Sequence, residues 1–333
     1  MKGEIKEDMI GIVKGTGSYV PSRILENEDI ANLVDTNDAW IRERTGVARR
    51  HIISDETTVS MAGEAGKRAL ADAGILPEEV DLILVSTISS EVILPCAACE
   101  VQKYLGAFRA TCFDLSAACT GFVLAYNTAQ AYLRSGIYQT VLIIGSESMS
   151  NLTNWEDRGT CILFGDGAGA MVLQAGEGAC YTPVTHSEGE KGAALTCRSR
   201  QDVSCLSNNV IHYPEEAYKI QMDGRAVFQF AVKNVPDAIQ EVIVKNKIAQ
   251  QDINWYILHQ ANQRIVEGAA KRLKEPLEKF PMNLKEYGNT SSASIPILLD
   301  EMKKDGRLKS GQKVIMAGFG AGLTWGASLL EWK

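Results

Sequence analysis

The chain has 333 residues, of which 45% are hydrophobic, and a formal net charge of −7 at pH 7. This length suggests about two domains with a large buried core, and an acidic chain without a dominant basic stripe is not expected to bind nucleic acid. The N-terminal residues, MKGEIKEDMIGIVKG, carry acidic side chains where a signal peptide needs an apolar run. No stretch approaches the ~18 apolar residues of a membrane span, so we expect a cytoplasmic protein with no membrane partner.

The eight cysteines are scattered along the chain rather than gathered in a short framework, which is typical of reduced thiols. Cys96 and Cys99 form a CxxC motif. Because no second cysteine pair or HxxxH motif completes a tetrahedral set of ligands, we expect no metal site.

The first part of the chain predicts a strand and a polar helix. Residues 10–17 (IGIVKGTG) read as a strand whose GTG begins like a dinucleotide-binding motif, but the third glycine is missing. Residues 35–46 (DTNDAWIRERTG) form a polar segment in which a helix begins at an Asp or Asn. Trp40 beside Arg44 suits stacking on an adenine and pairing with phosphates, although a capped helix with a salt bridge explains the same residues.

The next segments predict a parallel sheet covered by helices. An alanine-rich helix over residues 57–74 ends at a glycine, and residues 81–87 (DLILVST) form a strand that is apolar on both faces. Such a strand is typical of a parallel sheet with helices on both sides. We then expect a helix over 91–105 after Pro95, a strand at Phe113, a helix from Cys119 to Gly136, a strand over 141–145 and glycine-containing strands over 161–174.

After a polar, irregular stretch over residues 175–223 the pattern begins again. We expect a long helix over 225–247 with a kink at Pro236, a strand over 255–258, helices over 261–274 and 292–304, and two strands around a glycine-rich turn over 313–332. Both halves contain an apolar strand, a small-residue loop that opens a helix, and strands separated by FGDGAG or FGAG. This recurrence predicts an internal duplication into residues 1–175 and 176–333, whose equivalent loops meet at a shared centre.

Cys119 is the candidate nucleophile. It lies in FDLSAACTGF (residues 113–122), where small residues leave room for a bulky group to approach the sulfur. The N-terminus of the following helix favours a thiolate by roughly 0.3–1 kcal/mol, so we expect the thiol to be partly ionised. The alternative is that Cys119 is a small buried hydrophobic side chain, which is the commoner role of an intracellular cysteine.

His259 and Asn289 occupy comparable positions in the second half. His259 ends a buried strand and begins the motif HQAN, and Asn289 lies in the small, polar run EYGNTSSAS. Each residue alone is more often structural, but a Cys, a His and an Asn that all lie where a strand ends or a helix begins favour a shared catalytic site. Papain-like proteases have the same order of these residue types, but their CGSCW surroundings are absent here.

Five motifs in this chain, FDLSAACTGF, FGDGAGA, HQAN, GNTSSAS and GFGAGLTWG, together resemble those of the β-ketoacyl-acyl carrier protein synthase III family in the thiolase superfamily. The resemblance runs from Ile10 to Trp332. It implies an α/β, thiolase-like five-layered αβαβα fold built from two duplicated halves, and a homodimer. It also implies an acyltransferase that starts fatty acid synthesis by condensing an acyl-CoA primer with malonyl-acyl carrier protein, releases CO2 and CoA, and needs no cofactor.

The same resemblance implies a role for each candidate residue. Cys119 matches the cysteine that accepts the acyl group, an exchange of one thioester for another. His259 and Asn289 match the donors that stabilise the enolate left by decarboxylation. The backbone N–H groups of Cys119 and Ala321 would hold the tetrahedral oxyanion. The family often has glycine at Ala321, which is tolerable because only the amide is used.

Two further groups of residues match binding positions of that family. Trp40 and Arg158 match residues that flank the adenine of CoA, Arg44 one near its phosphates, and Asn262 one that lines the pantetheine channel. Three basic residues that share one face of the helix after HQAN suit an acidic carrier protein, although a solvated helix face explains them equally. These residues are Arg264, Lys271 and Arg272.

Two departures from the family pattern leave the primer open. Cys96 stands where serine is common, and residues 190–210 form an unusual version of the loop before the second half. Both lie in regions that can shape an acyl pocket. A specialised relative that transfers or condenses acyl groups in secondary metabolism, a cysteine hydrolase and a non-catalytic acyl-binding module remain as alternatives. Chalcone synthase-like enzymes lack these flanking motifs, and a hydroxymethylglutaryl-CoA synthase needs a catalytic glutamate near the cysteine.

Overall fold

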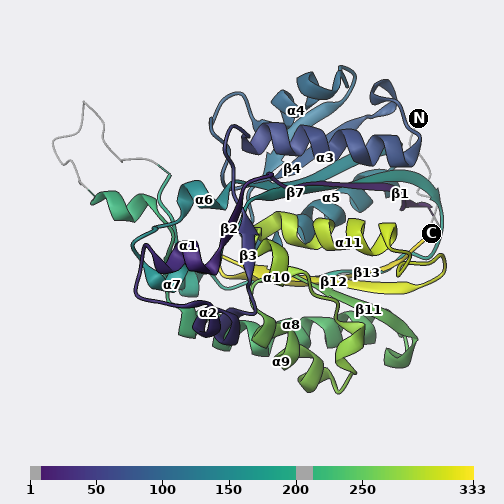
Figure 1. Cartoon of the computed structure of the whole chain (residues 1–333). Coiled ribbons are helices and arrows are strands. Elements are labelled where there is room, and N and C mark those ends of the chain that lie inside the picture. The colour runs from purple at the N-terminus through teal and green to yellow at the C-terminus, as the bar shows by residue number, and fades with distance from the viewer. Residues whose placement is uncertain (1–8, 200–212) are drawn as a thin grey trace.

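The computed structural model describes residues 9–199 and 213–333, which form five stacked layers (Figure 1). Helices α3 and α4 cover one face of a first sheet, α8 and α9 cover the outer face of a second sheet, and α5 and α11 lie between the two sheets. The six helices are α3 (Thr58–Ala73), α4 (Ala97–Leu105), α5 (Gly121–Arg134), α8 (Gly224–Lys245), α9 (Gln263–Leu273) and α11 (Ser294–Lys304). This arrangement confirms the predicted αβαβα fold.

The first sheet has the strand order β1-β7-β6-β4-β5. Its strands are β1 (Met9–Tyr19), β4 (Leu82–Ser86), β5 (Thr111–Leu115), β6 (Thr140–Glu147) and β7 (Gly167–Glu177). The pairs β1·β7 and β7·β6 are antiparallel, whereas β6·β4 and β4·β5 are parallel. Every residue of β4 and β6 is buried, as expected for strands with helices on both faces.

The second sheet repeats this pattern in the order β8-β13-β12-β11. Its strands are β8 (Val184–Ser187), β11 (Ile253–Leu258), β12 (Lys313–Gly320) and β13 (Thr324–Glu331). The pairs β8·β13 and β13·β12 are antiparallel and β12·β11 is parallel, in the same sequence as β1·β7, β7·β6 and β6·β4. The matching pairings confirm two duplicated halves. β7 runs to Glu177, two residues past the predicted division after residue 175.

The two central helices contribute to a core shared by both sheets and present their N-termini to each other. Phe122 on α5 and Leu298 on α11 belong to one buried cluster that also contains residues of both sheets. Each helix is preceded by a short 3₁₀ turn whose first residue has positive φ: Ala118 (φ 45°) before α5 and Ser291 (φ 49°) before α11. The duplication therefore extends to single residues of the loops that open these helices.

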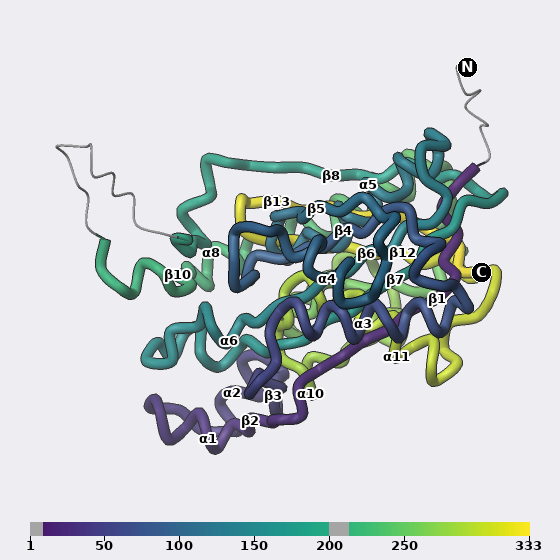
Figure 2. The backbone as a smooth tube through the Cα atoms, turned by 90° about the horizontal axis from the view of Figure 1, so that it is seen from above, coloured from purple at the N-terminus to yellow at the C-terminus, as the bar shows by residue number. Residues whose placement is uncertain are grey.

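The remaining elements are short, and several gather at one end of the layers (Figures 1 and 2). They are β2 (Ile24–Glu26), α1 (Asn27–Ala31), α2 (Asp38–Thr45), β3 (Arg49–His51), α6 (Met149–Leu152), α7 (Arg158–Cys161), β9 (Leu195–Thr196), β10 (Gln221–Met222) and α10 (Leu284–Tyr287). Within the described residues, no helix is both long and apolar enough to cross a membrane.

Three predictions about elements are wrong in detail. The helix predicted from residue 91 begins at Ala97, after Pro95, because proline disfavours helical geometry in the residue before it. Cys161 ends helix α7 instead of beginning a strand. β8 was missed within the stretch predicted to be irregular, because only Val184 of its four residues is buried and it therefore has no apolar periodicity. Cys205 and part of the loop over 190–210 lie outside the described residues.

Candidate active site

Cys119 lies in the 3₁₀ turn Ala118–Thr120, directly between β5 and the N-terminus of α5. The residues next to Cys119 must be small for two reasons: a substrate has to reach the sulfur, and the backbone of β12 packs closely against the backbone of Cys119. A Cβ atom on Gly320 of β12 would lie 2.8 Å from the backbone nitrogen of Cys119, closer than real Cβ contacts occur. The glycine-rich end of β12 therefore allows the two halves to approach each other at the sulfur.

Cys119 is 9% exposed, and burial raises the pKa of its thiol to about 12. The expectation of a partly ionised thiol is therefore wrong for the unliganded protein, because desolvation outweighs the influence of the helix N-terminus. The Cys119 thiol donates a hydrogen bond to Ser291 Oγ at 3.5 Å, and the Ser291 hydroxyl donates to Glu147 Oε1 at 3.0 Å. These hydrogen bonds connect the Cys119 thiol through Ser291 to the Glu147 carboxyl group, so the thiol proton has a path that does not involve His259.

Glu147 is a buried carboxyl group that sequence analysis missed. It ends β6 and connects the two halves: Oε2 accepts from the Ile88 backbone N–H (3.1 Å) and Ser89 Oγ (2.7 Å), and Oε1 accepts from Ser291 Oγ and from Ser292 Oγ (2.9 Å). Burial raises its pKa. The only sequence signal was an acidic residue at the end of the otherwise apolar and small run VLIIGSE.

The raised pKa of Glu147 predicts a pH-dependent stability difference between the wild type and Glu147→Gln. The folded protein favours the protonated carboxyl more than the unfolded chain does, so the free energy of unfolding should fall as pH rises from about 4.3 to the raised folded pKa, and stay level above it. Glu147→Gln has no proton to lose and should lack this fall. Urea unfolding of both proteins at several pH values between about 4.5 and 8 measures their free energies of unfolding. A difference between the two proteins that does not change with pH would contradict a raised pKa of Glu147.

His259 is buried at the C-terminal end of β11, where its backbone N–H donates to the Ala317 carbonyl of β12 at 2.8 Å. Burial lowers the pKa of the imidazole to about 3, so it is neutral at physiological pH. Its Nδ1 lies 2.7 Å from Ser294 Oγ, which also accepts the backbone N–H of Gln260 at 3.3 Å. The Ser294 hydroxyl proton is therefore available to Nδ1, which leaves the imidazole proton on Nε2.

Asn289 follows α10 in the loop that opens α11, a position equivalent to that of the Cys119 loop before α5. Its Oδ1 accepts the backbone N–H of Ser291 at 2.8 Å. Because a backbone N–H can only donate, this bond fixes the orientation of the side-chain amide and leaves its NH2 group free to donate elsewhere.

Cys119, His259 and Asn289 line one cavity of about 440 Å³, together with Phe319 and Gly320 of β12. Arg44, Asn262 and Arg264 line the same cavity. The structure thus brings together a thiol, a neutral imidazole and an oriented amide from both halves of the chain. Such a set can accept an acyl group and stabilise a developing negative charge without contributing a countercharge.

A second cavity, of about 350 Å³, also reaches Cys119. Its lining is largely apolar, with Ile88, Leu152 and Ile220 among its residues, and it includes Ala321. Leu195 to Ser199, within the loop over 190–210, line it too, whereas Cys96 does not. Cys119 therefore borders two cavities, one shared with His259 and Asn289 and one without them.

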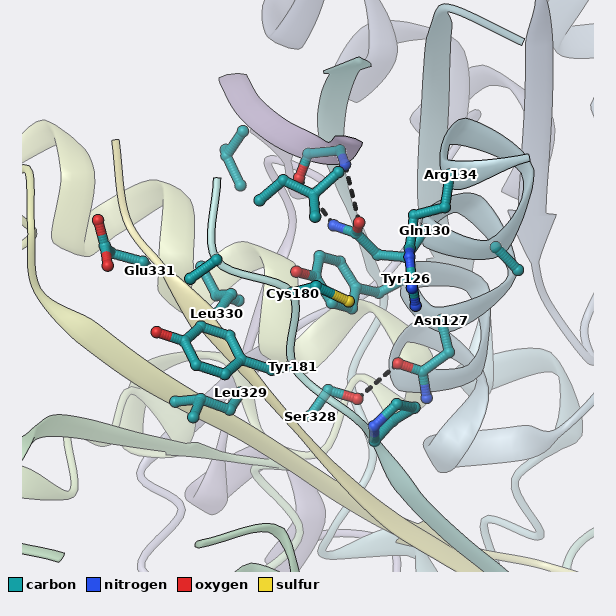
Figure 3. Close-up of a pocket in the computed structure, with 16 residues that line it drawn as sticks. Tyr126, Asn127, Gln130, Arg134, Cys180, Tyr181, Ser328, Leu329, Leu330 and Glu331 are labelled. Atoms are coloured by element: carbon teal, nitrogen blue, oxygen red, sulfur yellow. Dashed lines mark hydrogen bonds between the residues drawn. The ribbon is translucent and has the colours of Figure 1, made fainter. Parts of the chain in front are cut away.

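A third cavity of about 160 Å³ lies between α5, β13 and residues 179–183, and none of the candidate catalytic residues lines it (Figure 3). Its polar side chains are engaged with the protein: Gln130 exchanges two hydrogen bonds with the backbone of Gly11, and Asn127 Oδ1 accepts from Ser328 Oγ at 2.6 Å. These contacts join α5 to β1 of the first sheet and to β13 of the second sheet.

The predicted CoA residues lie together at α2. Asn37 caps this helix by accepting the backbone N–H of Trp40 at 2.9 Å. The guanidinium groups of Arg44 and Arg158 lie 5.6 Å and 4.9 Å from the centre of the Trp40 ring. Asn262 joins α2 to α9, because its Nδ2 donates to the Arg44 carbonyl at 3.0 Å while its Oδ1 caps α9.

The predicted basic patch on α9 is weaker than its sequence suggests. Arg272 pairs with Asp237 of α8 at 2.6 Å, and Arg264 lies over the ring of Phe228 at 5.5 Å. Lys271 is exposed. Among residues 9–199 and 213–333, no cluster of three or more His, Cys, Asp or Glu side chains is arranged to hold a metal ion.

Comparisons with known proteins point to one family. Residues 113–189 match the family model described as 3-oxoacyl-(acyl-carrier-protein) synthase III, and residues 243–332 match the model of the C-terminal part of that enzyme. The chain is 45% identical over 328 residues to a β-ketoacyl-(acyl-carrier-protein) synthase III of Clostridium acetobutylicum, covering 96% of this chain and 97% of the relative.

Solved structures are similar over the same extent. The 3-oxoacyl-(acyl-carrier-protein) synthase III of Aquifex aeolicus is 40% identical, with a TM-score of 0.90, and the match covers 97% of this chain and all of the other. A priming β-ketosynthase from the R1128 polyketide biosynthetic pathway is 33% identical, with a TM-score of 0.91 and coverage of 100% and 99%.

Proposed function

Because the chain belongs to the 3-oxoacyl-(acyl-carrier-protein) synthase III family, we propose that Cys119, His259 and Asn289 carry out its decarboxylative condensation of an acyl-CoA primer with malonyl-acyl carrier protein. The protein is an acyltransferase of the condensing type that acts in fatty acid synthesis. The observation that carries the residue assignment is the single cavity lined by these three side chains.

In the first step the sulfur of Cys119 attacks the acyl-CoA thioester carbonyl, the carbon–sulfur bond to CoA breaks, and CoA leaves as its thiol with the proton given up by Cys119. Ser291 and Glu147 lie on the hydrogen-bonded path of that proton. The backbone N–H groups of Cys119 and Ala321 hold the tetrahedral oxyanion. The apolar cavity beside Cys119 receives the acyl chain.

In the second step the malonyl group loses CO2, and the remaining enolate carbon attacks the acyl carbonyl on Cys119. The carbon–sulfur bond to Cys119 then breaks, the β-ketoacyl-acyl carrier protein leaves, and the Cys119 thiolate takes up a proton from water. The enolate oxygen accepts hydrogen bonds from Nε2–H of His259 and the NH2 group of Asn289. The low pKa of His259 supports this role, since the imidazole stays neutral and keeps its Nε2 proton. These groups supply the chemistry without a resident cofactor.

Trp40, Arg44, Arg158 and Asn262 bind the nucleotide and pantetheine parts of CoA in this proposal. Arg158→Ala should raise KM for acyl-CoA about two- to fivefold and leave kcat nearly unchanged, because an exposed cation–π contact contributes about 0.5–1 kcal/mol. Steady-state kinetics with varied acyl-CoA measure both constants. Arg134→Ala, which removes an exposed arginine from α5, is the control; equal effects of the two substitutions would argue against a specific site at Trp40.

The carrier protein docks on Arg264, Lys271 and Arg272 in this proposal, and the enzyme works in the cytoplasm as a homodimer. The dimer is supported by β5, an edge strand that pairs only with β4 within the first sheet. An open edge strand is a template for pairing with another chain. Beside it lie exposed apolar side chains, among them Leu94 (84% exposed) and Phe108 (75% exposed).

A second candidate function is acyl transfer or condensation in secondary metabolism, which is favoured by the similarity to the R1128 priming β-ketosynthase. Both functions use the same acyl-enzyme and differ in the acceptor. The second candidate would be supported if acyl-CoA were consumed only when an acceptor other than malonyl-acyl carrier protein is present.

The experiment that tests the proposed function follows the acyl group to its product. The protein is incubated with acyl-CoAs of different length and branching, with and without malonyl-acyl carrier protein, and β-ketoacyl-acyl carrier protein, CO2 and free acid are quantified. We expect β-ketoacyl product and CO2 only when both substrates are present. Free acid formed without malonyl-acyl carrier protein would indicate a hydrolase, and binding of acyl-CoA without any product would indicate a non-catalytic module.

A further inference from the structure

Two cysteines that the proposed reaction does not use lie in contact at the start of α4. Cys96 is the N-cap residue of this helix, and Cys99 lies in its first turn. Their sulfur atoms are 3.4 Å apart, within the range of a thiol hydrogen bond. Both side chains are partly exposed.

The backbone at this site is held firmly, so that the two sulfurs stay close. Asp114 of β5 accepts the backbone N–H groups of Ala97 and Ala98 through its two carboxylate oxygens, each at 2.8 Å. The backbone N–H of Cys99 donates to the Cys96 carbonyl at 3.1 Å. Asp114 and these turn contacts fix the first turn of α4, and the two thiols face each other across it.

We infer that Cys96 and Cys99 are a reversible redox pair, which closes to a disulfide under mild oxidation and reopens with a dithiol. A CxxC sequence at a helix N-terminus places two thiols so that side-chain rotation alone brings their sulfurs from contact to bonding distance, about 2.0 Å. Here the sulfurs start only 3.4 Å apart. In this structure both cysteines are free thiols, as expected from the sequence.

With hydrogen peroxide as the oxidant, the reaction balances in two displacements. The sulfur of the Cys96 thiolate attacks one peroxide oxygen, the O–O bond breaks, and hydroxide leaves and takes up a proton to give water and a Cys96 sulfenic acid. The Cys99 sulfur then attacks the sulfenic sulfur, the S–O bond breaks, and the hydroxide leaves as water with the Cys99 proton. Two thiols lose two electrons in total, and the peroxide is reduced to two waters.

The assignment of Cys96 as the attacking residue rests on its contact with Cys99. Cys96 lies at the N-cap position of α4, and its sulfur is in contact with the Cys99 sulfur. The hydrogen bond with Cys96 raises the pKa of the Cys99 thiol, so Cys99 keeps its proton while Cys96 reacts.

Cys112 is the competing partner for Cys99. It lies on β5, where its thiol donates to the Ala110 carbonyl at 3.5 Å, and burial raises its pKa to about 12. The Cys112 thiol is directed at the Ala110 carbonyl, whereas the sulfurs of Cys96 and Cys99 are 3.4 Å apart. The disulfide should therefore form within the CxxC motif rather than between α4 and β5.

Oxidation with a small excess of hydrogen peroxide, followed by alkylation of the remaining thiols and peptide mapping by mass spectrometry, tests this inference on the full-length protein. We expect the wild type and Cys112→Ser to form the Cys96–Cys99 disulfide within the same time, and dithiothreitol to restore both thiols. Cys96→Ser should form no disulfide at Cys99. Because this readout does not involve acyl transfer, its outcome is independent of the proposed function.

Three results would overturn the inference. The first is oxidation of Cys119, Cys180 or Cys197 in the wild type while Cys96 and Cys99 remain alkylated. The second is a Cys99–Cys112 disulfide in the wild type. The third is oxidation of Cys99 at the same rate in Cys96→Ser as in the wild type. Circular dichroism of each variant establishes that the proteins compared are folded.

Discussion

Replacing Cys119 by alanine is expected to remove the acyl-enzyme and to lower kcat/KM for condensation by on the order of 10³- to 10⁶-fold, the range found when an enzyme's nucleophile is deleted. The reason is chemical: among the residues that the structure describes, no other thiol lines the cavity that holds His259 and Asn289. Condensation then has no carrier for the acyl group. The measurement is the mass of the intact protein after exposure to acyl-CoA, together with steady-state turnover.

Cys161→Ala is the matched control for this prediction. Cys161 is also fully buried, and burial raises its pKa to about 11, but it lies at the end of α7 and lines neither cavity at Cys119. We expect this variant to gain the acyl mass as the wild type does. Acyl mass on Cys119→Ala, or its loss in Cys161→Ala with the fold intact, would remove the assignment of Cys119 as the nucleophile.

Replacing His259 or Asn289 by alanine is expected to lower the rate of condensation by on the order of 10²–10³, the usual cost of one donor to a developing oxyanion. Acyl transfer to Cys119 should change much less, because the backbone amides of Cys119 and Ala321 serve that step. Asn289→Asp should be at least as slow as Asn289→Ala, since a carboxylate repels the enolate. Rapid-quench measurements of acylation and of β-ketoacyl formation separate the two steps.

His186→Ala provides the control for the histidine variant, because His186 is exposed and paired with Glu241 at 2.8 Å. With the pKa of His259 near 3, the wild-type condensation rate should show no titration of this imidazole between about pH 5 and 8. The role of His259 as a neutral donor would be contradicted by a wild-type condensation rate that falls with an apparent pKa near 6.5, if the rate of His259→Ala did not change with pH in this range.

The strands and helices that position Cys119, His259 and Asn289 were predicted from the sequence because each depends on short-range patterns. The strand ending at His259, the small residues around Cys119 and the repeated FGDGAG and FGAG motifs are all readable locally. The helix over 57–74 was predicted with both of its ends, since Thr57 caps it and Gly74 adopts the left-handed conformation that ends it.

Other features depend on contacts between residues far apart in the sequence. Glu147 accepts hydrogen bonds from Ser291 and Ser292, which lie 144 and 145 residues away, so no local pattern revealed that it is buried near Cys119. The raised pKa of Cys119 has the same origin, because its burial results from the packing of Gly320 and the Ser291 loop against α5. Strand β8 was missed because its pairing with β13, not its side chains, makes it a strand.

The most direct test of the account follows one acyl group on and off Cys119. Wild-type protein is acylated with acyl-CoA, freed of excess substrate, digested and mapped, and a second portion is mixed with malonyl-acyl carrier protein before digestion. We predict that the acyl mass lies on the peptide containing Cys119 and disappears in the second portion as an equal amount of β-ketoacyl-acyl carrier protein forms. An acyl group on a different peptide, or one that stays on Cys119 after malonyl-acyl carrier protein is added, would contradict the account.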